Sequence, residues 1–126
     1  MRELTQEAVV ATVMQYVEAW NEADAAIRLI MFERCWADDA TYVDPNVELS
    51  GRAALCAHVS KVQSGRPGAW IEMMSGIDVH HNVIRFLWRL VRADGSAGDT
   101  SIDFGEIDSS RRLIRIVGFF GEAPQR

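Results

Sequence analysis

Residues 40–45 of the sequence read Ala40-Thr41-Tyr42-Val43-Asp44-Pro45, a short run of strand-forming residues that ends in an acid. β-branched and aromatic side chains favour extended backbone. An Asp-Pro pair commonly starts a turn, because the aspartate side chain accepts hydrogen bonds from nearby backbone N–H groups. Asp44 therefore has two interpretations. It either forms a turn after the strand, or it points into a pocket and transfers protons.

The residues before this strand are predicted to form two helices. Thr5 is suited to cap the first, in which Val9, Val13, Tyr16 and Trp20 recur at helical spacing and share one face. Asp24 is suited to cap the second. That helix has apolar residues on most of its circumference, so we expect it to be well buried. These residues are Ile27, Leu29, Ile30, Met31, Phe32, Cys35 and Trp36.

The residues after the strand are predicted to form one more helix and then mainly strands. Ser50 and Gly51 can open the third helix, which the segment 64–68 (Ser-Gly-Arg-Pro-Gly) ends. Strands are expected at 70–77, 83–92, 98–107 and 113–120, separated by turn-forming residues. Helices followed by consecutive antiparallel strands indicate an α+β fold in which helices pack on one face of a curved sheet. We expect a single domain over residues 1–126.

Composition excludes several classes of protein. The chain has 126 residues, of which 48% are apolar and 25% charged, as in ordinary globular proteins. Its net charge of -5 argues against a non-specific nucleic-acid interface. No membrane span, signal peptide or dinucleotide-binding fingerprint is evident, so we expect a cytoplasmic protein without a cofactor. Cys35 and Cys56 are expected to be free thiols.

Three segments resemble the SnoaL-like and ketosteroid isomerase group of the nuclear-transport-factor-2-like superfamily. Residues 16–21 (YVEAWN) resemble the end of that group's first helix, 37–45 (ADDATYVDP) its first strand, and 118–122 (GFFGE) its last strand. The resemblance implies a cone formed by a strongly curved, mostly antiparallel sheet, closed by helices around an apolar pocket. It also implies a homodimer that pairs through the outer face of the sheet.

The resemblance implies three catalytic residues, namely Asp44, Tyr16 and Asp103. Asp44 would be the base that removes a proton next to a carbonyl, and Tyr16 and a neutral Asp103 would donate hydrogen bonds to the oxygen. Asp103 alternates with Ile102 and Phe104, so the simplest strand interpretation places Asp103 in water. The opposite assignment, with Asp103 facing the cone, holds if the outer face of the sheet is apolar because it contacts a partner.

The remaining candidates are aromatic residues and histidines. The expected substrate-binding residues are Trp20, Tyr42, Phe86, Trp88, Gly118 and Phe120. Aromatic residues of this kind are equally suited to an ordinary core. His80 and His81 are adjacent and suit a hairpin, so no metal site is expected. His58 or His81 is the histidine to examine for dehydratase chemistry.

Three functions therefore remain open. The first is an isomerase or cyclase that enolises a hydrophobic carbonyl compound, steroid-like or polyketide-like, by acid–base chemistry. The second is a non-catalytic module that binds an apolar small molecule. The third is an epoxide hydrolase or dehydratase on the same scaffold. We expect neither a nucleic-acid partner nor a membrane partner.

Overall fold

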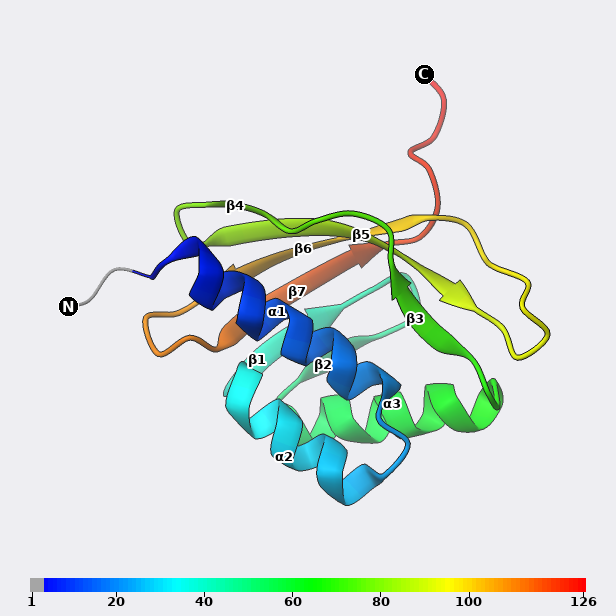
Figure 1. Ribbon diagram of the computed structural model, residues 1–126, viewed down its shortest axis with the longest axis horizontal. Coiled ribbons are helices and arrows are strands. Elements are labelled where there is room, and N and C mark those ends of the chain that lie inside the picture. The colour runs from blue at the N-terminus through cyan, green and yellow to red at the C-terminus, as the bar shows by residue number, and fades with distance from the viewer. Residues whose placement is uncertain (1–3) are drawn as a thin grey trace.

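The computed structural model describes residues 4–126, which form three helices and a seven-stranded sheet (Figure 1). The helices are α1 (Gln6–Asn21), α2 (Ala25–Cys35) and α3 (Arg52–Gly65). The strands are β1 (Trp36–Val43), β2 (Glu48–Ser50), β3 (Trp70–Met73), β4 (Asp78–His80), β5 (Val83–Val91), β6 (Ser101–Ile107) and β7 (Leu113–Phe119). Figure 1 shows the helices gathered on one side of the curved sheet. The α+β cone predicted from the sequence is confirmed.

The sheet has the strand order β2-β1-β7-β6-β5-β3, and β4 pairs with the first residues of β5. Strands β1 and β7 run parallel, and the other pairs are antiparallel. The first strand begins at Trp36, four residues before the run that predicted it. Strands β2 and β4 were not predicted, because each has only three residues and shows no alternation to detect. The parallel pair brings the end of β1, and with it Asp44, beside β7.

Helix α1 presents the apolar face that its sequence predicts. Val9, Val13 and Tyr16 are buried, and they belong to the hydrophobic core between the helices and the sheet. The Thr5 side chain accepts a hydrogen bond from the Ala8 N–H, as an N-cap does. The helix therefore holds Tyr16 in the core and brings Trp20, one turn later, to the open end of the cone.

The expected burial of α2 is wrong. Ile27 and Ile30 are each 49% exposed, whereas Arg28 on the opposite side is 1% exposed. The Asp24 side chain caps this helix as predicted, accepting hydrogen bonds from two backbone N–H groups of its first turn. An apolar circumference did not predict burial here, because only one side of α2 contacts α1 and α3 and a charged residue lies on that side.

Strand β6 resolves the ambiguity at Asp103. The side chains of Ser101, Asp103 and Ile107 are buried under the helices, whereas Phe104 lies on the opposite face and is 42% exposed. The outward assignment of Asp103, which is the simplest interpretation of the alternation, is therefore wrong. At the start of this strand the polar Ser101 and Asp103 face the inside of the cone, and the aromatic Phe104 faces outwards.

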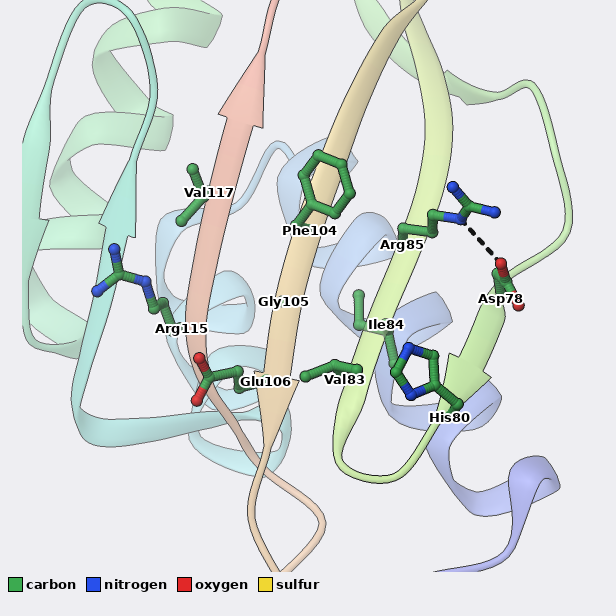
Figure 2. Close-up of a pocket in the computed structure, with 10 residues that line it drawn as sticks. All are labelled: Asp78, His80, Val83, Ile84, Arg85, Phe104, Gly105, Glu106, Arg115 and Val117. Carbon is green, nitrogen blue, oxygen red and sulfur yellow. Dashed lines mark hydrogen bonds and ion pairs between the residues drawn. The ribbon is translucent and has the colours of Figure 1, made fainter.

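The outer face of the sheet carries a shallow cleft of about 470 Å³ (Figure 2). Phe104 lies in its centre, with Arg115 and Glu106 on one side and the Arg85–Asp78 ion pair, 2.8 Å long, on the other. Figure 2 shows these side chains in front of the strands and the helices behind them. The cleft is thus separated from the inside of the cone by the sheet.

None of the helices within residues 4–126 combines the length and the apolar character needed to cross a bilayer.

Candidate functional site

The inside of the cone contains two adjoining cavities that share part of their lining. The outer cavity has a volume of about 290 Å³ and the inner niche about 30 Å³. Trp20, Tyr42, Ile71 and Trp88 line both. The niche is completed by Tyr16, Val17, Phe86 and Asp103. The outer cavity also contacts polar residues, namely Asp44, Asn46, His58, Arg66, Asp99 and Ser101.

Asp44 both forms the turn after β1 and lines a cavity. Its Oδ1 accepts hydrogen bonds from the Asn46 and Val47 N–H groups at 2.8 and 3.1 Å, which is the turn geometry of an Asp-Pro pair. Its Oδ2 accepts a hydrogen bond of 2.6 Å from the Tyr42 hydroxyl, and the carboxylate lines the outer cavity. Three donors therefore fix the orientation of a carboxylate that a ligand in this cavity can reach.

Asp103 meets Asp44 across a glycine on the neighbouring strand. A Cβ atom placed on Gly118 would lie 2.8 Å from Asp103 Oδ1 and 3.6 Å from Asp44 Cβ. Any side chain at this position would displace the Asp103 carboxyl. Gly118 thus makes the room in which two acids, 59 residues apart in sequence, lie next to each other.

Asp103 is 6% exposed, and its pKa is raised to about 7 by the net effect of its surroundings, of which burial is the largest and the effects of Asp44 and Trp88 are already part. The nearby Asp44 carboxylate acts in the same direction as burial, and the Trp88 indole N–H, which donates to Asp103 Oδ1 at 3.0 Å, lowers the pKa. Burial and the second acid both disfavour the ionised form of Asp103. Near neutral pH, Asp103 is therefore partly protonated and able to donate a hydrogen bond.

Tyr16 lies at the closed end of the niche, stacked on Trp36 at a ring distance of 5.6 Å. Burial raises the pKa of the Tyr16 hydroxyl well above its ordinary value, and Tyr42 and Asp103 add to this effect. The nearby indole of Trp20 acts in the opposite direction. Tyr16 is therefore a neutral hydroxyl, which is the form that donates.

The residues expected to bind substrate are placed as follows. Trp20, Tyr42 and Trp88 line both cavities, and Phe86 lines the niche. Phe120 lines the outer cavity, is 44% exposed and makes an edge-to-face contact with Trp88 at 5.9 Å. Gly118 was expected to contact the substrate, but in the structure it leaves room for the Asp103 carboxyl.

Among the three histidines, His58 lies at the outer cavity, 5.9 Å from the rings of both Trp20 and Tyr42. Burial lowers its pKa, and the neighbouring Asp44 acts in the opposite direction. His80 ends β4 and His81 begins the hairpin, on the other side of the sheet. Within residues 4–126, no three His, Cys, Asp or Glu side chains are grouped so that they could hold a metal ion.

Two contacts in the site were not predicted. The hydrogen bond from Tyr42 to Asp44 has a signal in the sequence, because residues two apart on a strand share a face. The hydrogen bond from Trp88 to Asp103 has none, because it joins two strands whose register the sequence does not reveal.

The structure is similar to solved structures of nuclear-transport-factor-2-like proteins. A candidate isomerase of the SnoaL-like family from Agrobacterium tumefaciens has 27% identity and a TM-score of 0.87, covering 93% of this chain and 100% of its own. A candidate SnoaL-like polyketide cyclase from a Jannaschia species has 12% identity and a TM-score of 0.73, covering 94% and 90%. A SnoaL-like protein of unknown function from Burkholderia thailandensis has 15% identity and a TM-score of 0.71, covering 95% and 100%.

Neither a protein-family model nor a curated protein matches this chain. At 12% and 15% identity, the second and third structures show the fold alone. The first structure is similar in sequence as well, over almost the whole chain. The chain therefore has the nuclear-transport-factor-2-like fold, and its structural neighbours confirm the resemblance of its sequence to the SnoaL-like proteins of that superfamily.

Proposed function

We propose that this protein is a small-molecule isomerase or cyclase that enolises a hydrophobic carbonyl compound. The observation that carries the proposal is the pairing of two unlike carboxyl groups across Gly118. Asp44 is held by three donors at the outer cavity, and Asp103 is buried with a pKa of about 7. A buried carboxyl that is partly protonated near neutral pH, beside a second carboxyl at the ligand cavity, is suited to acid–base chemistry on one ligand.

In the proposed reaction, Asp44 removes a proton from the carbon next to the carbonyl group. Negative charge then develops on the carbonyl oxygen, where Tyr16 and neutral Asp103 donate hydrogen bonds. The proton returns from Asp44 to another carbon in an isomerisation. In a cyclisation, the enolate carbon attacks an electrophilic carbon of the same molecule and closes a ring. The apolar walls keep water away from the enolate.

The size of the outer cavity bears on the substrate. Its volume of about 290 Å³ lies at the lower end of the range of roughly 300–1,000 Å³ for drug-sized ligands. The single-chain cavity therefore suits a compound of one or two rings better than a four-ring steroid. A larger substrate would extend past Phe120 into solvent.

Asp44→Asn tests this proposal, because the amide keeps the shape of the side chain but cannot accept the proton. With a β,γ-unsaturated cyclic ketone as substrate, we expect turnover to fall at least ~100-fold, and binding of the saturated ketone to change by less than about threefold. Asp39→Asn is the matched control, since Asp39 is an exposed acid on the same strand. Equal turnover by the wild type and Asp44→Asn would refute the enolisation mechanism.

One observation favours the hydrolase or dehydratase as a second candidate. His58 lies at the outer cavity close to Asp44, and its pKa is lowered, so that it is a neutral base at physiological pH. Such a pair can activate water or a substrate hydroxyl. Loss of a dehydration reaction in His58→Gln, with isomerisation unaffected, would favour this candidate. Binding of a ketone without any turnover would favour the non-catalytic module.

The proposal includes a homodimer formed through the outer face of the sheet. Phe104 and Phe119 are exposed there and contact each other edge-to-face at 6.3 Å. Arg85 and Arg115 lie near Asp78 and Glu106, so a two-fold axis across this face can place opposite charges together. A second copy would cover both the aromatic pair and the cleft of Figure 2. A cytoplasmic location stays a prediction.

A further inference from the structure

Two buried donors inside the cone have no hydrogen-bond partner within residues 4–126. They are the Tyr16 hydroxyl and the Trp20 indole N–H. Tyr16 is 2% exposed, and the Trp20 nitrogen is buried although the edge of its ring is not. A buried polar group without a partner costs about 1–3 kcal/mol, so two of them side by side indicate that something else satisfies them.

Both donors line the inner niche. They lie near each other: the two rings make an edge contact at 6.5 Å, and the Trp20 indole N–H is directed towards the Tyr16 oxygen closely enough to lower the pKa of Tyr16, although the two groups do not reach hydrogen-bond geometry. The niche of about 30 Å³ has room for one oxygen atom, because a water needs at least about 10–15 Å³ on this measure. Its other walls are mainly apolar, so a bound oxygen has few other places to receive hydrogen bonds.

We propose that Tyr16 and Trp20 together bind a single terminal oxygen of the ligand, with Trp20 as a catalytic donor in addition to the residues named above. The inference rests on the proposed function for the identity of this oxygen, which would be the carbonyl oxygen that becomes the enolate. The inference assigns a hydrogen bond to Trp20, a residue from which the sequence predicted only apolar contact with the ligand.

Trp20 can donate a hydrogen bond under conditions in which Asp103 cannot. An indole N–H donates at every accessible pH, whereas Asp103 donates only while it is protonated. Asp103 Oδ1 also already accepts the Trp88 N–H at 3.0 Å, which leaves one oxygen for the ligand. Trp20 and Tyr16 therefore form a donor pair that does not depend on the ionisation of Asp103.

The shape of the niche defines the class of ligand. Only a terminal, unsubstituted oxygen fits, as in a ketone, an enol or a phenol. An ether or ester oxygen would bring a second carbon into the same space. The rings of the ligand would fill the outer cavity, next to Trp88 and Asp44.

The experiment compares 2-naphthol with naphthalene, which has the same rings and no oxygen. We expect Trp20→Phe to weaken 2-naphthol binding about tenfold and naphthalene binding less than about twofold, because the phenyl ring keeps most of the contact and loses the N–H. Tyr16→Phe should act likewise, and the double variant should lose less than the sum of both. Equal weakening of the two ligands by Trp20→Phe would show that Trp20 only packs, and would overturn the inference.

A second measurement uses the wild-type protein, in case the variants do not fold. The indole N–H signal of Trp20 in a ¹H–¹⁵N spectrum should move downfield with 2-naphthol and hardly move with naphthalene. Trp36 provides the control signal, since its indole N–H is also buried without a partner in the described chain but does not line either cavity. Equal movement of the Trp20 signal with both ligands would contradict the proposal.

These results are independent of the enolisation chemistry, because 2-naphthol binding requires neither turnover nor Asp44. If the selectivity for 2-naphthol depends on Trp20 but no ketone is isomerised, the oxygen site stands and the proposed reaction fails. If ketones turn over but Trp20→Phe weakens the binding of 2-naphthol and naphthalene equally, the proposed reaction stands and the oxygen site fails.

Discussion

Asp103 is the residue whose environment has the clearest consequence for pH dependence. Its pKa is about 7 in the folded protein and near 3.8 in an unfolded chain, chiefly because burial disfavours the carboxylate. Between these values the folded state binds the extra proton, so the free energy of unfolding falls as pH rises. This difference in pKa corresponds to roughly 4 kcal/mol of stability. The folded protein has this stability below about pH 4 and loses it as the pH rises past 7.

We therefore expect Asp103→Asn to change the pH dependence of stability. As the pH rises from about 4.5 to 8, the free energy of unfolding of the wild type, measured with urea, should fall by about 2–4 kcal/mol relative to that of Asp103→Asn. In the wild type, kcat/KM for the ketone should also decline above about pH 7, as Asp103 loses the proton that it donates. Parallel stability curves for the two proteins would show that Asp103 does not titrate in this range.

Sequence reasoning named candidate site residues that line the cone but did not predict their contacts. Tyr16, Asp44 and Asp103 all line the cone, and the structure assigns Gly118 the task of making space between the two acids. Strand alternation alone pointed Asp103 to the wrong face. Only the exposed aromatic face of the sheet, a feature of tertiary structure, reverses that assignment.

At the scale of elements, the end of α1 is held by a buried arginine of α2. Arg28 donates to the Glu22 carbonyl at 2.8 and 3.0 Å and to Gln63 of α3 at 2.8 Å. Gln63 in turn donates to the Trp20 carbonyl at 2.7 Å. The C-terminal end of a helix carries partial negative charge, which a buried cation complements. This network fixes the turn of α1 that carries Trp20.

We expect Arg28→Met to lower the free energy of unfolding by about 2–4 kcal/mol, because the methionine fills similar space but makes none of the hydrogen bonds from Arg28 to the Glu22 carbonyl, Gln63 and Ser60. Urea unfolding measures the change. Arg34→Met on the same helix is the control and should alter stability by less than about 0.5 kcal/mol, since Arg34 is exposed. If Arg28→Met and Arg34→Met lose the same small amount of stability, Arg28 does not stabilise the network.

The apolar residues of α2 explain why its burial was predicted wrongly. Helical periodicity identifies which residues share a face, but not which face meets the rest of the protein. In α2 the exposed side carries Ile27 and Ile30, and the charged Arg28 lies inside. A sequence pattern gives no sign that an arginine caps a neighbouring helix, because its partners are backbone carbonyls of another element.

At the scale of the whole molecule, the order of helices and strands was enough to predict the class of fold. The curvature of the sheet and its register were not predictable, because they depend on pairs such as Trp88 with Ser101 that are distant in sequence. The cone brings Tyr16, Asp44 and Asp103 from distant parts of the sequence to two adjoining cavities. The same curvature leaves the outer face, with Phe104 and Phe119, in contact with solvent in the single chain.

The proposed homodimer would bury that outer face, and this can be tested. Phe104 is 42% exposed and Phe119 57% exposed, and burying two such side chains per chain would contribute several kcal/mol to association. We expect the wild type to sediment with about twice the 14.1 kDa mass of one chain. Phe104→Glu should return it to the mass of one chain, because the charge would be buried without a partner.

Ile30→Glu is the matched control for this change, since Ile30 is equally apolar and 49% exposed but lies on α2, on the helical side of the sheet. It should leave the mass of the assembly unchanged. A wild-type protein that stays a single chain at high concentration would contradict the dimer, and so would dissociation by Ile30→Glu but not by Phe104→Glu. The catalytic proposal is unaffected by either result, because every residue that it uses lies inside one cone.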